Sequence, residues 1–219
     1  MKTITAQKPW EEIAGYLEKC RVAYLIGCGT CATMCRTGGK SQVLEMKERL
    51  EAIGKRVTGW MVIPTACDEL TKYALRENAG DIQAADCVLV MTCAFGVQTV
   101  AFYLDKPMPV YPALNTLFIG LEESPGHFVD VCTQCGNCRL GGTAGICPLV
   151  RCAKGLLNGP CGGSVGGRCE ISPDVPCAWQ MIIDRLQAIG RLDILEEIAP
   201  PHDWSASRSG GPRTAIIEG

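Results

Sequence analysis

Short apolar runs alternate with amphipathic segments along the first half of the chain. Four runs predict strands, 22–26, 57–63, 87–91 and 108–111, and the continuous apolar run at 22–26 is typical of a strand buried on both faces. Apolar residues recur with helical spacing in four other segments: 10–20, 41–53, 68–78 and 97–104. Strands separated by such helices pair in parallel through right-handed crossovers. We therefore predict an α/β fold for residues 1–125, a small Rossmann-like or flavodoxin-like sheet covered by helices.

The pattern changes near residue 125. Residues 127–176 are rich in glycine and cysteine and show no hydrophobic period, and helical spacing returns only at 178–189. A segment of this kind buries too little apolar surface to fold by itself, so metal ligation must supply its order. We predict a ferredoxin-like, cysteine-rich domain over residues 126–198, with a helix at its end.

The last residues, 199–219, form a third region. Several prolines and glycines exclude a helix there, whereas Trp204 and the apolar pair Ile216-Ile217 would have no use in a frayed end. We expect an extended C-terminal arm that places these side chains in grooves of a partner protein. A frayed terminus is the alternative.

Composition and charge indicate which partners and which cellular compartment the protein has. The chain has 219 residues, of which 15 are cysteine, and a formal net charge of −2. This charge argues against nucleic acid or an anionic lipid surface as the main partner, and no apolar stretch is long enough for membrane insertion. The first ten residues lack the apolar stretch of a secretory signal, and the cysteine count is odd. We therefore expect a cytoplasmic protein whose thiols bind metal.

Cysteines follow three of the predicted strands. Parallel strands end at one edge of their sheet, where α/β proteins bind ligands. Five thiols are expected to converge at that edge: Cys28, Cys31, Cys35, Cys67 and Cys93. We predict that the last four ligate a [4Fe–4S] cluster, with Cys28 as a fifth candidate. Zinc is the alternative, although zinc sites usually have two CxxC knuckles and this one has a single CxxC.

The second half contains a CxxCxxC motif formed by Cys132, Cys135 and Cys138. Five more cysteines follow it: Cys147, Cys152, Cys161, Cys169 and Cys177. A ferredoxin run places a Cys-Pro pair three residues after its third cysteine, and here eight residues intervene. Eight thiols suffice for two clusters. We predict that the motif shares one with Cys177 and that the remaining four cysteines hold another, with a structural zinc module as the alternative.

Other residues carry weaker signals. Cys20 and Cys87 lie at the ends of predicted elements, and we interpret them as small packing residues. His127 and His202 have no cysteine at ligand spacing, and we assign them to the surface or to packing. Residues 27–32 resemble a dinucleotide-binding turn but have a cysteine at the third glycine position. Because no catalytic set is visible, we expect a redox subunit without catalytic residues of its own.

Six segments are similar to one known family: LIGCGTCATMC at 25–35, CDE at 67–69, CAFGVQTV at 93–100, YPALNT at 111–116, NGPCGG at 158–163 and PHDWS at 201–205. They resemble the methylenetetrahydrofolate reductase C-terminal-domain-type proteins, the small iron–sulfur subunit of the two-subunit reductase of acetogenic bacteria. The resemblance implies a partner, the FMN-containing TIM-barrel subunit that reduces methylene-tetrahydrofolate to methyl-tetrahydrofolate in the Wood–Ljungdahl pathway.

These observations together predict an electron-transfer subunit with two to three [4Fe–4S] clusters that passes electrons to the partner's flavin. Nothing in the sequence binds NAD, so ferredoxin or another redox subunit is the expected donor. A zinc-stabilised scaffold without a redox role is the alternative. A corrinoid module would need an axial histidine in the loop after the first strand, and no histidine precedes His127.

Overall fold

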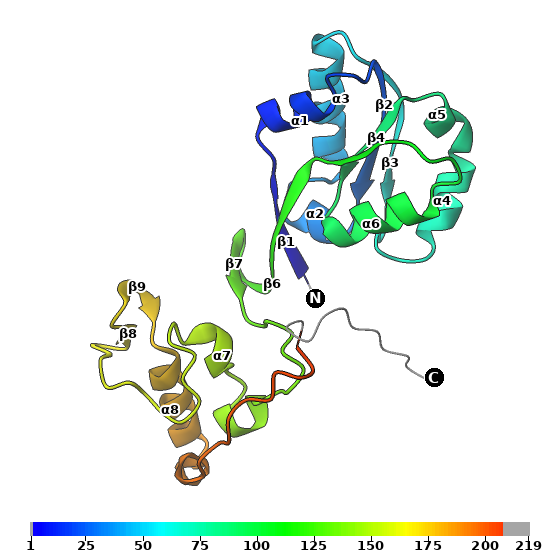
Figure 1. The fold of residues 1–219 in the computed structure, drawn as a ribbon. Helices are drawn as coiled ribbons and strands as arrows, with labels where there is room; N and C mark the ends of the chain where they lie inside the picture. Colours follow the sequence, from blue (N-terminus) through cyan, green and yellow to red (C-terminus); the bar gives the residue numbers. More distant parts are fainter. Residues whose placement is uncertain (1, 208–219) are drawn as a thin grey trace. The chain divides into compact units, whose positions relative to one another are not determined.

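A computed structural model describes residues 2–207 of the chain (Figure 1). Its first part is an α/β fold built on a four-stranded parallel sheet of order β3-β2-β4-β5. The strands are β2 (Val22–Cys28), β3 (Arg56–Ile63), β4 (Cys87–Met91) and β5 (Val110–Pro112). The predicted α/β class is confirmed, and a strand forms at each of the four predicted places, although the one predicted over 108–111 begins at Val110.

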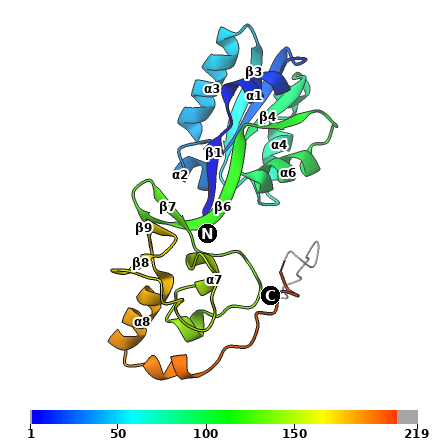
Figure 2. The same ribbon diagram turned by 60° about the vertical axis from the view of Figure 1, so that its left-hand side comes forward.

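Helices cover both faces of this sheet (Figures 1 and 2). One face packs against α1 (Trp10–Tyr16) and α3 (Lys40–Ala52), and the other against α4 (Thr71–Glu77), α5 (Ala79–Gln83) and α6 (Ala94–Tyr103). The sheet therefore separates two buried apolar clusters. Successive side chains of β2 point to opposite faces of the sheet, so Leu25 packs in the α1–α3 cluster and Ile26 packs in the other.

Two helix predictions differ from the structure in their bounds. The helix predicted over 10–20 ends at Tyr16, and the one predicted over 68–78 begins only at Thr71 and ends at Glu77, before the separate short helix α5. The Asn78 side chain donates to the Ala74 carbonyl oxygen at 2.9 Å, which helps to end α4. Both differences concern element ends, which hydrophobic spacing defines poorly.

A second sheet, which the hydrophobic pattern did not predict, has the order β1-β6-β7. Its strands are β1 (Lys2–Gln7), β6 (Leu114–Ser124) and β7 (His127–Asp130). The antiparallel partners β1 and β6 are more than a hundred residues apart in sequence, with Gln7 opposite Leu114. Their pairing is therefore set by tertiary structure and not by a local pattern.

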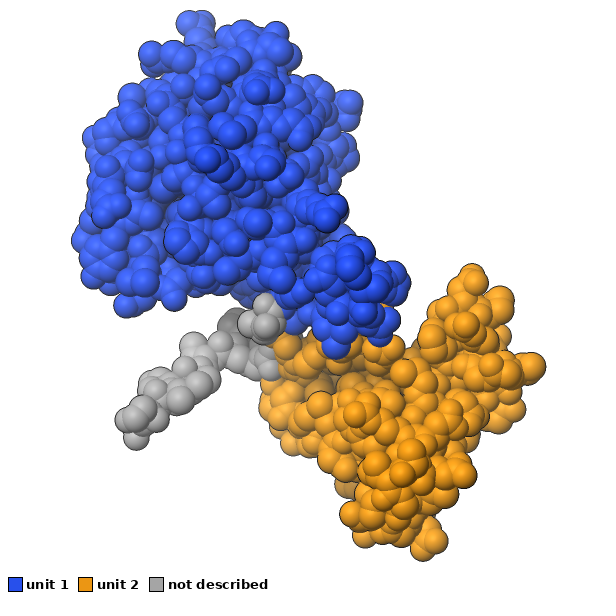
Figure 3. All heavy atoms as spheres, turned by 180° about the vertical axis from the view of Figure 1, so that it is seen from behind, with its two compact units in different colours: residues 1–128 blue, residues 129–219 orange. Residues whose placement is uncertain are grey.

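The chain divides into two compact units, Met1–Phe128 and Val129–Gly219 (Figure 3). The second contains α7 (Pro148–Arg151), α8 (Ala178–Ala188), a hairpin of β8 (Arg168–Cys169) and β9 (Ser172–Pro176), and 3-10 turns at Leu140–Thr143 and Leu192–Glu196. Among its described residues, the apolar core is confined to Ile146 and three side chains of α8: Trp179, Ile182 and Leu186. The predicted helix at 178–189 is confirmed.

Within residues 2–207, no helix is long and apolar enough to cross a membrane. The predicted arm begins inside the described part of the chain, where residues 201–204 have no regular secondary structure. Its apolar pair Ile216-Ile217 lies outside the described residues.

Candidate metal centres

Four cysteines of the first unit line one cavity of about 620 Å³: Cys28, Cys31, Cys67 and Cys93. They come from three separate connections, after β2, β3 and β4. Cys28 and Cys93 are buried, whereas Cys67 is exposed. The cavity thus lies at the carboxyl edge of the parallel sheet, where the sequence places this group of thiols.

The sheet topology explains why the thiols meet there. In the order β3-β2-β4-β5, the connection after β2 leads to β3 on one side of it, and the connection after β3 leads to β4 on its other side. The carboxyl ends of β2 and β4 are therefore the topological switch point of the sheet. The loop after β2 also folds back over the sheet, because the amide of Cys28 donates to the Gly38 carbonyl oxygen at 3.0 Å. A Cβ at Gly38 would overlap the Met91 backbone, so the close approach requires glycine there.

The cavity thiols influence one another electrostatically. Partial burial raises the pKa of Cys67, and nearby Cys93 and Cys28 raise this pKa further, with a smaller effect of Cys31. Thiolates crowded without a cation repel one another, so a cationic group among them would favour the charged form. The hydroxyl of Thr30 also lies 3.2 Å from the Cys28 sulfur.

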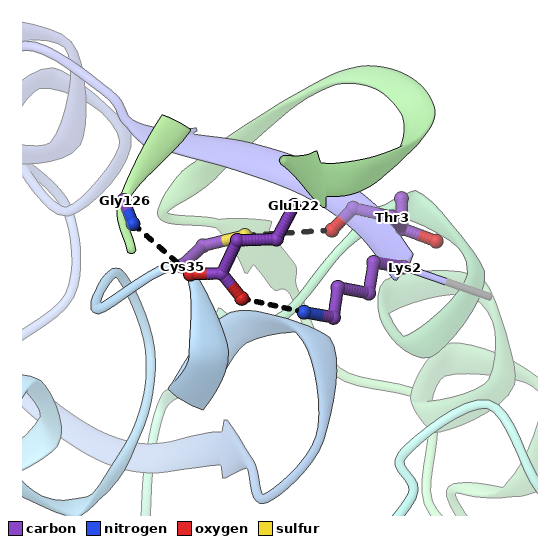
Figure 4. A network of polar contacts seen from close by, with 5 residues as sticks. All are labelled: Lys2, Thr3, Cys35, Glu122 and Gly126. Atoms are coloured by element: carbon purple, nitrogen blue, oxygen red, sulfur yellow. Dashed lines mark hydrogen bonds and ion pairs between the residues drawn. The ribbon is translucent and has the colours of Figure 1, made fainter. Parts of the chain in front are cut away.

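Cys35 is placed differently from the other four candidates. It is the residue after α2 (Cys31–Met34), and its thiol is 3.8 Å from the Thr3 carbonyl oxygen on β1 (Figure 4). In the same view the Lys2 ammonium pairs with Glu122 at 2.6 Å, and Glu122 also accepts from the Gly126 amide. Cys35 does not line the cavity. The geometry therefore favours Cys28 over Cys35 as the fourth cavity thiol.

A second group of four cysteines lines one small pocket in the second unit: Cys152, Cys161, Cys169 and Cys177. Lys154 and Glu170 line the same pocket and form an ion pair. The Lys154 ammonium, together with a hydrogen bond from Cys161, holds the pKa of the Glu170 carboxyl below its usual range. The structure therefore groups Cys177 with the other three pocket cysteines and not with the CxxCxxC motif. Cys147 does not line this pocket.

The other four cysteines of the second unit are the three of the CxxCxxC loop and Cys147, which lies just before α7. In the loop, Gln134 has a left-handed φ of 57°, and its amide donates to the Cys132 sulfur at 3.3 Å. The amide of Gly163 donates to Cys161 in the same two-residue pattern at 3.4 Å. Amide donors to sulfur stabilise thiolates, so both loops are suited to metal ligation.

Within residues 2–207, no three His, Cys, Asp or Glu side chains form a site for a single metal ion.

Cys20 and Cys87 lie apart from these groups, in the apolar cluster beneath α1 and α3. Both are buried, and burial together with the neighbouring Cys20 raises the pKa of Cys87 far above its usual range. A thiol held neutral in this way packs as a small apolar side chain.

Fold and cysteine placement define the class of protein: a doubly wound α/β unit joined to a cysteine-rich unit. Residues 111–205 match the family described as methylene-tetrahydrofolate reductase C terminal. This part of the chain, less than half of its length, is similar to that family, and it contains all eight cysteines of the second unit. No curated protein and no solved structure matches the chain.

Proposed function

We propose that the chain is an iron–sulfur electron-transfer subunit that serves a methylenetetrahydrofolate reductase. The observation that carries the proposal is the convergence of four cysteines from three strand ends on one cavity. The family match over residues 111–205 connects this chemistry with one-carbon metabolism. A [4Fe–4S] cluster, when bound, takes up and gives up single electrons.

The chain's own residues would hold up to three clusters. Cys28, Cys31, Cys67 and Cys93 would hold one in the first unit. The pocket group Cys152, Cys161, Cys169 and Cys177 would hold another, and Cys132, Cys135, Cys138 and Cys147 would remain for the third. The last set combines a CxxCxxC motif with a Cys-Pro pair, which are the elements of a ferredoxin run.

The proposed partners are an FMN-containing subunit, which would perform the reduction of the folate, and ferredoxin or another redox subunit as donor. Exposed apolar residues accompany the cavity cysteines. Phe95 lines the cavity and is 47% exposed, and Met34 and Leu70 follow Cys31 and Cys67 by three residues and are exposed as well. Exposed apolar side chains are typical of a lasting subunit interface, so we assign these three to the contact with the flavin subunit.

Replacing Phe95 by serine is expected to raise the Kd for the flavin subunit about tenfold, or ~1.4 kcal/mol, the loss of one apolar anchor. Titration calorimetry of the two anaerobic subunits measures this value. Phe102→Ser is the matched control, because Phe102 is 79% exposed on the same helix, about 10 Å further along. A Kd for Phe95→Ser equal to that of the wild-type chain would remove the interface assignment.

Reversible bleaching tests the redox role itself. The anaerobic full chain should absorb at about 400 nm through sulfide-to-iron charge transfer, lose that band on reduction and regain it on mild oxidation. The rival function, a zinc-stabilised scaffold, predicts a colourless protein that does not respond to reductant. A colourless chain with stoichiometric zinc would rule out electron transfer.

A further inference from the structure

His202 is a buried histidine whose polar atoms are unused. Its exposed fraction is 9%, and its ring packs edge-on against Trp204 with the centroids 4.6 Å apart. Neither ring nitrogen has a hydrogen-bond partner among residues 2–207. A buried polar group without a partner is destabilising, so such a group indicates an acceptor or donor that residues 2–207 do not provide.

The segment around His202 is fastened to the loop that bears the CxxCxxC motif. We call residues 199–207 the strap and residues 132–139 the cysteine loop. The Arg139 guanidinium donates through Nη2 to the Pro200 carbonyl oxygen at 3.1 Å. At the other end of the strap, Ala206 packs so closely on Gly136 that a Cβ at Gly136 would lie 2.6 Å from it. His202 therefore lies between two contacts of the strap with the cysteine loop.

A third anchor fixes the beginning of the strap. The Asn158 side chain accepts from the Ala199 amide at 2.7 Å and donates to the Ala199 carbonyl oxygen at 3.0 Å. Cys138, Arg139 and Pro200 border a cavity of about 340 Å³. The strap is thus held in place by its own unit and leaves space beside the motif.

The cysteine loop also contains a buried hydrogen-bond donor without a partner among the described residues. The Nε atom of Arg139 is buried and has no acceptor among the described residues, although Nη2 of the same side chain is bonded. A guanidinium can only donate, and a neutral imidazole carries one donor. Two unpaired donors beside one cysteine loop call for a group rich in acceptors and negative charge. Thiolate and sulfide sulfurs of a bound cluster have both properties.

We infer that His202 and Arg139 donate hydrogen bonds to the sulfurs of the cluster that the cysteine loop binds, which makes them positioning residues and not ligands. The inference rests on the proposed function. Hydrogen bonds to cluster sulfurs stabilise the reduced, more negative state and so raise the midpoint potential. The strap would thereby tune this cluster and shield it from water, while the other two keep their potentials.

The test is an anaerobic redox titration of the full chain, followed by electron paramagnetic resonance at one fixed pH. Cys132→Ser identifies the signal of the loop cluster by its loss. His202→Ala is expected to shift the midpoint potential of that signal to a more negative value with iron content unchanged. His202→Gln, which keeps an N–H donor, should restore much of the shift. Arg139→Met should act in the same direction, independently of how histidine packs.

His127→Ala is the matched control, because the His127 side chain is 65% exposed. Equal midpoint potentials in His202→Ala, Arg139→Met and His127→Ala would overturn the inference while leaving the proposed function intact. Loss of about four irons in His202→Ala would also overturn it, because His202 would then be a ligand. A wild-type chain without iron would overturn the proposed function, and the inference with it.

Discussion

Replacing Cys93 by serine is expected to remove about four irons per chain, one complete cluster. Cys93 is buried, lines the first unit's cavity and directly precedes α6. Its position is therefore fixed, and replacing it removes one of the four proposed thiolate ligands. The same loss is expected for Cys28→Ser. Iron and sulfide analysis of the anaerobically purified variants measures both effects.

Cys87→Ser is the control for this experiment, because Cys87 is equally buried but lies in the apolar cluster away from the cavity. It should keep all of its iron. Cys35→Ser decides between the two candidates for the fourth thiol, since Cys35 contacts Thr3 and does not line the cavity. Full iron in Cys28→Ser together with a loss of four in Cys35→Ser would contradict our assignment.

Removal of iron is expected to unfold the second unit and to spare the first. The first unit has buried apolar clusters on both faces of its sheet, whereas the described part of the second has a core of four buried side chains. If the chain binds the proposed clusters, metal ligation would supply most of the second unit's folding free energy. After chelation, limited proteolysis should leave a stable fragment close to residues 1–128 and degrade the remainder.

The holo chain treated with the same protease is the reference, and both units should survive in it. The Cys93→Ser variant separates iron loss in the first unit from unfolding of the second. It should lose the first unit's iron, and its second unit should stay resistant to the protease. An apo chain whose second unit resists proteolysis as well as the holo chain would show that its order does not depend on metal.

Local patterns were sufficient for the parallel sheet and insufficient for what surrounds it. The runs that became β2 and β4 are continuous and apolar, so their burial is evident from the sequence. β3 contains Arg56, Thr58 and Gly59 and is only partly buried at the edge of the sheet. β1 contains one large apolar residue, Ile4, and becomes a strand because β6 pairs with it. Such pairing between distant segments leaves no local trace in the sequence.

The candidate sites show the same division. The convergence of thiols at the sheet edge followed from parallel topology, because all parallel strands end on one side. Choosing Cys28 over Cys35 needed side-chain directions within one short loop, and grouping Cys177 with Cys161 and Cys169 needed the path of an irregular segment. The sequence analysis left His202 between a surface and a packing role, because burial within a Pro- and Gly-interrupted segment depends on contacts with a distant loop. The structure buries its ring against Trp204.

The most direct test of the account is metal and sulfide analysis of the full chain, purified without oxygen. Iron, acid-labile sulfide and zinc should be measured in the same sample. We predict about eight to twelve irons per chain, four for each of two or three clusters, with sulfide in equal amount and no stoichiometric zinc. A sample with one or more zinc ions per chain and neither iron nor sulfide would contradict the account.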